Sequence, residues 1–452
     1  MGIFDKYSSQ LDRIDPIKYT GTVARVIGLL IESKGPHAVV GELCQILVPK
    51  GRGVVWAEVV GLKGSTVQLM TYDEMEGIEV GCLVIAMGEQ LSVPVSEKLL
   101  GRVLDSMGKP IDGKGDIGSA DLYSIFGSPP HVLRRQRITE KMTTGIRAID
   151  GLITVGKGQR VGIFSGSGVG KSTLLGMIAR NTSAQVNVIA LIGERGREVR
   201  EFIENELGEE GLKRSVIIVA SSNKPPISRI RGAYIATAVA EYFRDRGLDV
   251  MLLFDSVTRF ARAQREVGLA VGEPPATRGY TPSVFAQLPK LLERSGAAEK
   301  GTITGFYTIL VEGDDMDEPI ADNVRGILDG HIVLERKLAE RNHYPAVDVL
   351  KSISRLAVAV TGDKTKKAAG FIKRMLAVYA EAEDLINVGA YAKGSNEEID
   401  MAIEVLPAIN KFLIQGIKEK STMGDALKRI GEIAGIEIPE EEIGSEALSV
   451  SA

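Results

Sequence analysis

The stretch that decides the fold is residues 159–173, which read QRVGIFSGSGVGKST. An apolar run breaks into a loop of small residues, and Lys171, Ser172 and a second apolar run follow directly. This order predicts a strand, a phosphate-binding loop and a helix. Small residues allow consecutive backbone N–H groups to face a phosphate, and the following helix points the positive end of its dipole at the same anion.

The loop predicts a site for a nucleoside triphosphate with Mg²⁺. Lys171 is expected to reach the β- and γ-phosphates, and the Ser172 hydroxyl is expected to bind Mg²⁺. The strict pattern begins with glycine, whereas this chain has Ser165, which is still small enough for a tight turn. The alternative is a glycine-containing loop that only caps a helix, but the Lys-Ser-Thr sequence favours the nucleotide site. The residues expected to hold the nucleotide here are Gly166, Ser167, Gly168, Val169, Gly170, Lys171, Ser172 and Thr173.

Length and composition bound the class of protein. The chain has 452 residues, 44% of them hydrophobic and 25% charged, which predicts a globular protein of two or three domains. A net charge of −4 provides no bulk attraction to nucleic acid or anionic lipid. Cys44 and Cys82 form no metal or redox motif and are expected to be buried, in a reducing compartment. The sequence contains no apolar run of ~18 residues and no signal-peptide pattern, so a cytosolic location is expected.

Two regions precede the phosphate loop. Residues 1–18 carry one apolar stripe at helical spacing and balanced charges, which predicts a helix that either docks a partner or packs on its own domain. Residues 19–95 contain short apolar runs between turns, which predicts a small antiparallel β-barrel. The apolar runs expected to form its strands are 22–31, 45–48, 54–60, 66–70 and 83–86.

The remainder predicts an α/β region followed by helices. Residues 96–364 begin with a turn-rich connection up to about residue 150, after which strands and helices alternate, as in a parallel sheet covered on both faces. Residues 365–452 lack strand patterns and are expected to form a helical domain, with helices over 366–386, 397–420 and 425–434. The expected buried strands are 161–165, 186–192, 216–220, 250–255, 302–311 and 331–334, with helices over 230–246 and 257–266.

Two strand ends carry acids suited to phosphate chemistry. Asp255 ends an apolar strand in the same α/β block as the phosphate loop, where a carboxylate can hold the Mg²⁺ shell. Glu194 follows the strand at 186–192 and is expected to activate the attacking water. Arg195 and Arg197 beside it suit either phosphate charge or the orientation of Glu194. The alternative is a solvated charge cluster at the start of a helix.

Two residues later in the chain each have two possible roles. Tyr344, in a proline-containing turn, either stacks on adenine or packs in the core. Arg355 is either a surface charge or an arginine finger.

Taken together, six segments resemble one family: 165–172, 192–195, 255–266, 272–277, 321–331 and 343–348. The chain resembles the flagellum-specific ATP synthases, the ATPases of flagellar type III protein export, which are homologous to the subunits of F-type ATP synthase. The likeness extends from about residue 20 to 435. Injectisome ATPases share nearly all of these motifs, so that function stays an alternative.

The resemblance implies a fold and an assembly. The expected fold class is an N-terminal β-barrel, a RecA-like P-loop α/β core with a mostly parallel sheet, and a C-terminal helical domain. The expected assembly is a homohexameric ring with ATP and Mg²⁺ held between neighbouring subunits. The family's functional positions fall on Lys171 and Ser172 for phosphate and Mg²⁺, Glu194 as catalytic base, Arg195 as its phosphate-facing neighbour, Asp255 for the Mg²⁺ shell, Tyr344 for adenine, and Arg355 as the finger from the adjacent subunit.

The resemblance also implies partners and a location. The expected partners are an export regulator, a stalk protein, the export gate, export chaperones and flagellar substrates. Membrane association is expected only through partners, at the cytoplasmic face of the inner membrane.

Two further functional classes fit the sequence less well. A rotary ATP synthase subunit is disfavoured because one chain carries both Glu194 and Arg355, and because Ser165 replaces the first glycine. A ring helicase that translocates RNA would need a basic barrel rich in aromatic residues. Residues 19–95 hold only Tyr19, Trp56 and Tyr72 as aromatics, so no nucleic-acid partner is expected.

Overall fold

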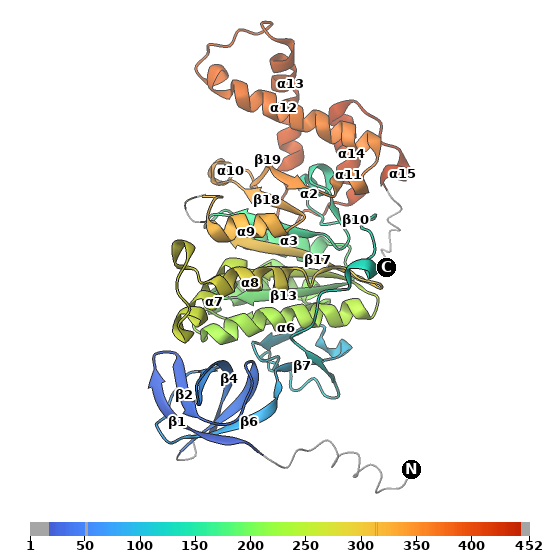
Figure 1. The fold of residues 1–452 in the computed structure, drawn as a ribbon. Coiled ribbons are helices and arrows are strands. Elements are labelled where there is room, and N and C mark those ends of the chain that lie inside the picture. The colour runs from blue at the N-terminus through green and yellow to red at the C-terminus, as the bar shows by residue number, and fades with distance from the viewer. Residues whose placement is uncertain (1–17, 50–52, 312, 314, 444–452) are drawn as a thin grey trace, which may run out of the picture.

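The computed structural model describes residues 18–49, 53–311, 313 and 315–443. A barrel, a central α/β region and a group of helices follow one another along the molecule (Figure 1). This architecture confirms the fold class predicted from the sequence. The helix expected over residues 1–18 lies, except for Lys18, outside the described residues.

The barrel closes in the strand order β1-β2-β5-β4-β3-β6. The single run predicted over 22–31 is wrong, because β1 and β2 form an antiparallel hairpin. Gly28 makes the turn with a φ of 55°, a conformation that glycine adopts without a steric penalty. Cys44 and Cys82 are buried free thiols, as expected. The strands are β1 (Thr20–Ile27), β2 (Leu30–Lys34), β3 (Glu42–Val48), β4 (Gly53–Lys63), β5 (Thr66–Thr71) and β6 (Leu83–Gln90).

A mixed sheet forms the central region, in the order β19-β18-β12-β17-β15-β13-β14-β8. Neighbours from β18 to β8 are parallel, whereas β19 runs antiparallel to β18 at one edge. Residues 102–105, predicted as part of a turn-rich connection, form the parallel edge strand β8. The strands are β8 (Arg102–Asp105), β12 (Arg160–Ser165), β13 (Val186–Ile192), β14 (Ser215–Ala220), β15 (Asp249–Asp255), β17 (Thr302–Leu310), β18 (Gly330–Leu334) and β19 (Val347–Ser354), with the short β16 (Gly296–Ala297) beside β17.

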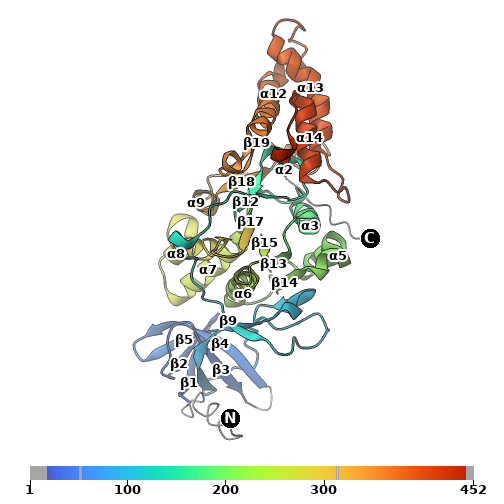
Figure 2. The same ribbon diagram turned by 90° about the vertical axis from the view of Figure 1, so that its right-hand side faces the viewer.

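Helices cover both faces of this sheet (Figure 2). Alternate residues of β13 divide between two apolar cores: Val188 and Ile192 join the core under α6, and Ile189 joins the core under α3. This division follows from the two-residue period of a strand and explains why β13 is apolar except at Asn187, whose side-chain amide donates to Ala179 O at 2.8 Å. One face carries α6 (Pro226–Asp245), α7 (Val257–Val271), α8 (Pro282–Leu292) and α9 (Pro319–Ile327), and the other carries α3 (Lys171–Asn181) and α5 (Gly208–Lys213).

The C-terminal helices include α12 (Asp363–Asn387), α13 (Glu397–Leu413), α14 (Met423–Ala434) and α15 (Glu440–Ile443). The prediction of one helix over 397–420 is wrong, because α13 ends at Leu413 and Ile414 is extended. Arg147, on the short helix α2 (Arg147–Leu152), donates to the carbonyls of Phe412 and Ile414. A buried guanidinium therefore satisfies carbonyls that the helix end leaves unpaired.

The remaining short elements connect these parts. They are β7 (Ser92–Val95), β9 (Asp121–Ser124), β10 (Lys141–Met142), β11 (Val155–Gly156), α4 (Gly196–Glu201), the π-helical turn η3 (Phe202–Leu207), α10 (Arg336–Glu340), α11 (Ala357–Val360), and the 3₁₀ turns η1 (Glu97–Leu99), η2 (Val132–Arg134) and η4 (Thr277–Gly279).

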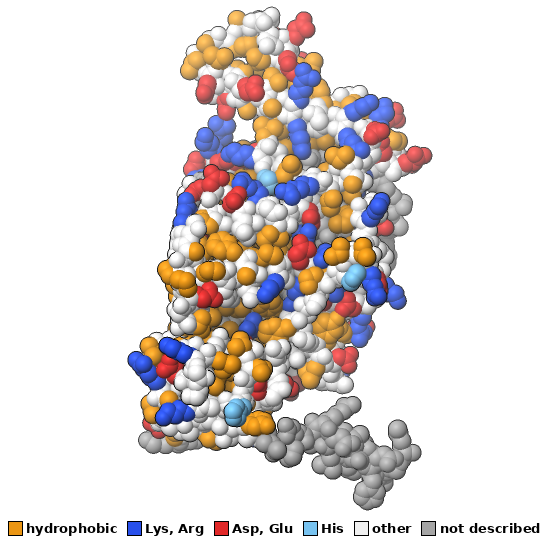
Figure 3. Space-filling view, in the orientation of Figure 1, with side chains coloured by type: hydrophobic (Ala, Val, Ile, Leu, Met, Phe, Trp, Pro, Cys, Tyr) orange, Lys and Arg blue, Asp and Glu red, His pale blue; other side chains and the backbone are white. Residues whose placement is uncertain are grey.

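The surface carries mixed charge. Lys and Arg side chains are interspersed with Asp and Glu over the face shown in Figure 3. Among the described residues, no helix is both long enough and apolar enough to span a membrane.

Candidate active site

The phosphate loop has the predicted strand–loop–helix form. Strand β12 ends at Ser165, and α3 begins at Lys171. Gly168 and Gly170 adopt φ values of 78° and 87°, in the left-handed region that favours glycine. Ser167 and Gly168 are exposed, so the N-terminus of α3 is open to a ligand.

The sheet brings two carboxylates to this loop. Glu194 follows the end of β13 and Asp255 ends β15, so both lie at the carboxyl edge of the parallel strands. Lys171 Nζ lies 2.5 Å from Asp255 Oδ1 and 3.6 Å from Glu194 Oε1. Three residues that are far apart in sequence therefore form one charge cluster, at the end of the strands where open α/β sheets bind ligands.

The cluster changes the proton affinity of its members. Burial, followed by the negative charge of Asp255, raises the pKa of Glu194 to about 7. Burial by itself would lower the pKa of Lys171, but Asp255 and Glu194 outweigh it, so that pKa is raised. Lys171 is therefore a fixed cation, and Glu194 has a proton affinity suited to a base near neutral pH.

Three further residues support this cluster, and sequence reasoning missed all of them. Thr308 Oγ1, near the carboxyl end of β17, donates to Asp255 Oδ1 at 2.8 Å. Glu198 is hydrogen-bonded to Glu194, which lowers the Glu198 pKa. Arg259 packs against Gly193, where an added methyl group would lie 2.9 Å from its Cβ. Only Glu198 had a local signal, since it is an acid four positions after Glu194 in the same charged segment.

Other predicted residues lie around the loop. A methyl group at Gly170 would lie 3.5 Å from the Tyr344 ring, so this half-exposed ring lies beside the phosphate loop. Arg195 is 74% exposed and pairs with Glu198 at 3.6 Å, which places it at the rim of the cluster. Ser172 is exposed on the first turn of α3. Thr173 donates instead to Glu206 of η3, at 2.9 Å.

Arg355 lies at the opposite end of the parallel strands, beside the amino end of β12. Its main-chain N–H donates to Asp329 O, and the N–H of Asp329 donates to the carbonyl of Arg160, the first residue of β12. The loop begins at the other end of that strand, after Ser165. At ~3.3 Å per residue the two ends are roughly 17 Å apart. Arg355 therefore does not join the cluster of its own chain.

The arrangement can bind a polyphosphate and poise a carboxylate for proton transfer. The open helix N-terminus and Lys171 supply positive charge, while Asp255 and the Ser172 hydroxyl are the hard oxygen ligands that Mg²⁺ prefers. The donor set thus fits a nucleoside triphosphate with Mg²⁺.

Three family models match successive parts of the chain. They are the ATP synthase alpha/beta family beta-barrel domain over 23–88, the nucleotide-binding domain of the same family over 145–354, and the T3SS EscN ATPase C-terminal domain over 361–432.

Similar proteins match over nearly the whole chain. The "Flagellum-specific ATP synthase" of Treponema pallidum is 58% identical and covers 97% of this chain and 98% of its own. The "Type 3 secretion system ATPase" of Xanthomonas euvesicatoria is 49% identical, with coverages of 91% and 93%.

Two solved structures share the fold. The assembled ATPase EscN of enteropathogenic E. coli has a TM-score of 0.87 at 42% identity, covering 92% of this chain and 100% of that chain. EscN in complex with its central stalk EscO has a TM-score of 0.85, with the same identity and coverages.

Proposed function

This chain belongs to the ATP synthase alpha/beta family, with flagellum-specific ATP synthases and type 3 secretion system ATPases as its relatives, and we propose that it hydrolyses ATP to support unfolding and export of flagellar proteins. The observation that carries the hydrolytic step is the placement of Lys171 between Asp255 and Glu194 at an open phosphate loop. The higher identity to a flagellar relative, 58% against 49% for a secretion ATPase, favours the flagellar system over an injectisome.

Within one chain, the side chains divide the work. Lys171 and the N–H groups of the loop hold the β- and γ-phosphates, and the Tyr344 ring stacks on adenine. Glu194 accepts the proton of the attacking water, and Arg195 holds phosphate charge at the rim. Ser172 and Asp255 would hold Mg²⁺. When bound, Mg²⁺ supplies neutralisation of the phosphate charge.

A complete site requires two chains. Arg355 starts from the edge of the sheet opposite its own loop, and an arginine side chain is shorter than the roughly 17 Å length of β12. A neighbouring subunit can supply this guanidinium in a ring, where each heterologous interface joins one loop to one finger. We take the ring to be a homohexamer with equivalent interfaces.

Partners enter the proposal through the relatives. A stalk protein is the partner best supported, because the structure of EscN with its central stalk EscO has this fold. We extend the proposal to an export regulator docked by residues 1–18, to the export gate, and to export chaperones with their flagellar substrates. Association with the cytoplasmic face of the inner membrane would follow from these partners.

One experiment tests the enzymatic core. The purified chain is assayed for ATP hydrolysis over a range of protein concentrations, and its oligomer size is measured with and without ATP and Mg²⁺. We expect specific activity to rise as rings form, because Arg355 of a monomer cannot reach the phosphate loop of the same chain. Full activity in a dilute monomer would contradict the shared site.

A further inference from the structure

A buried glutamine holds the turn that carries Arg355. Gln159 is fully buried just before β12. Its Nε2 donates to Asp329 O at 3.1 Å and to Ser354 Oγ at 3.0 Å. The same Asp329 carbonyl accepts the main-chain N–H of Arg355 at 3.0 Å. The Gln159 amide thus donates to Ser354, the residue before Arg355, and to the Asp329 carbonyl, which also accepts the main-chain N–H of Arg355.

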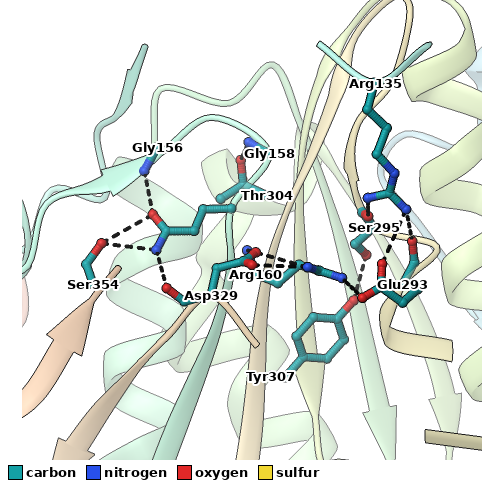
Figure 4. Close-up of polar contacts among 11 residues, drawn as sticks. Arg135, Gly156, Gly158, Arg160, Glu293, Ser295, Thr304, Tyr307, Asp329 and Ser354 are labelled. Atoms are coloured by element: carbon teal, nitrogen blue, oxygen red, sulfur yellow. Dashed lines mark hydrogen bonds and ion pairs between the residues drawn. The ribbon is translucent and has the colours of Figure 1, made fainter. Parts of the chain in front are cut away.

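The neighbours of this amide are themselves fixed. Arg160 holds the Asp329 carboxylate with two side-chain hydrogen bonds of 3.0 Å each, and also pairs with Glu293 at 2.5 Å. The Gln159 Oε1 accepts the N–H of Gly156 at 2.9 Å. In Figure 4, dashed lines join Gly156, Ser354 and Asp329 to one side-chain amide, and Arg160 and Glu293 lie beside them. The amide therefore has little freedom to move.

Strands β18 and β19 lie unusually close together just before Arg355. Gly330 at the start of β18 pairs with Ser354 at the end of β19. A methyl group at Gly330 would lie 2.5 Å from the Ile353 carbonyl oxygen and 3.1 Å from Ser354 Cα. The two strands approach more closely than any side chain at this position permits, so the backbone that leads into Arg355 has a narrowly defined path.

The Arg355 side chain contrasts with its backbone. The residue is exposed, and among the described residues the hydrogen bond of its guanidinium is a long one, from Nη2 to Arg325 O at 3.4 Å. A structural arginine would bury its head group and satisfy several donors, as Arg160 does. Here the main chain is fixed and the charged group remains available.

We propose that Gln159 is a positioning residue for Arg355: with Ser354 and Asp329 it fixes the main chain from which the guanidinium reaches the neighbouring subunit's nucleotide. The inference rests on the proposed function, because it assumes that Arg355 acts across the subunit interface. Loss of the amide would let the turn shift, and a displacement of about 1 Å from productive geometry can cost ~100-fold in rate.

The primary test is Gln159→Met, which keeps the length and bulk of the side chain and removes its donors. We expect turnover in assembled rings to fall about 10- to 100-fold. Nucleotide affinity should change by less than about twofold, because the finger acts on transition-state charge. If Gln159→Met does not fold, Ser354→Ala takes its place as the test. It removes the hydroxyl that accepts from Gln159 Nε2, and it should also lower turnover.

Gln185→Met is the control for loss of a glutamine amide at the same end of the strands, although Gln185 is exposed and Gln159 is buried. Gln185 precedes the parallel strand β13, and its Oε1 accepts the N–H of Asp249 at 2.9 Å, far along the sheet from the Arg355 turn. This variant should keep normal turnover. A comparable loss in Gln185→Met would mean that any such change at this edge impairs the enzyme, and would overturn the specific role of Gln159.

The decisive measurement combines Gln159→Met with Arg355→Ala in single-turnover assays. If Gln159 acts through Arg355, the double variant should be no slower than Arg355→Ala alone. An equal loss in both backgrounds would assign Gln159 a general structural role and overturn the inference, while leaving the finger intact. Near-normal turnover by Arg355→Ala alone would instead overturn the shared-site proposal and the role of Gln159 with it.

Discussion

The two ends of the parallel strands in the central sheet hold charge in different ways. At the carboxyl edge, Lys171, Glu194 and Asp255 form a tight cluster whose partners a bound ligand can replace. At the opposite edge, Arg160 and Asp329 are locked together, while the neighbouring Arg355 leaves its guanidinium exposed. The first edge is a site that one chain can fill, and the second is a scaffold that presents a group to another chain. One strand, β12, connects them.

The largest effect is expected at the carboxyl edge, from Lys171→Ala. Loss of the ammonium removes the charge on the β- and γ-phosphates and leaves two carboxylates together without their cation, so both turnover and nucleotide binding should be lost. Hydrolysis assays and nucleotide titration measure the two effects. Lys213→Ala, which changes an exposed lysine at the end of α5, is the control and should behave as wild type. Substantial turnover by Lys171→Ala would place the active site elsewhere.

Arg355→Ala tests the opposite edge and should separate the two functions. Turnover should fall by roughly 10³–10⁵, as for other trans-acting arginine fingers, while nucleotide binding stays nearly normal. Mixing this variant with Lys171→Ala sharpens the comparison, because an intact loop can then face an intact finger. Random equal mixing completes about one site in four, and the regained activity should exceed that of either variant alone. Near-normal turnover by Arg355→Ala would remove the distinction between the edges.

Glu194→Gln should lower turnover by about 10²–10⁴ and preserve nucleotide binding, since it keeps the shape and removes the base. The same residue predicts a pH dependence. Glu194 acts in its deprotonated form and its pKa is raised to about 7, so kcat/KM should fall as the pH drops below about 7. That acidic limb should be absent from the residual activity of Glu194→Gln. A wild-type profile that is flat from pH 5 to about 8 would contradict this role.

The smallest expected effect is that of Thr308→Val, which removes the hydroxyl bond to Asp255 and keeps the branched shape. A hydrogen bond to a charged group contributes about 1.5 kcal/mol, so turnover at limiting Mg²⁺ should fall about tenfold. Thr302→Val, on the same strand, removes a bond to Asp249 at the other end of the sheet and should leave turnover unchanged. Equal losses in both variants would indicate a general effect on β17.

The sequence by itself determined the features that depend on local chemistry. Gly168 and Gly170 need positive φ, and a lysine and hydroxyl at fixed offsets follow, so the loop was predictable residue by residue. The run at 186–192, apolar except for Asn187, predicted a strand buried on both faces. The two errors have different causes. The run at 22–31 folds back at Gly28, a local turn signal that the prediction passed over, whereas Arg147 helps to end α13 at Leu413 through a tertiary contact.

Only the tertiary structure decided which distant residues meet and which do not. The proximity of Lys171 to Asp255, separated by 84 positions, depends on the strand order, and no local pattern reveals the bond from Thr308. The separation of Arg355 from its own loop likewise follows from strand direction and register, as does the bond between Gln159 and Ser354, which are 195 positions apart. Local sequence encodes backbone conformation and burial over a few residues. Contacts between strands depend on how the whole sheet is ordered, because that order sets which ends share an edge.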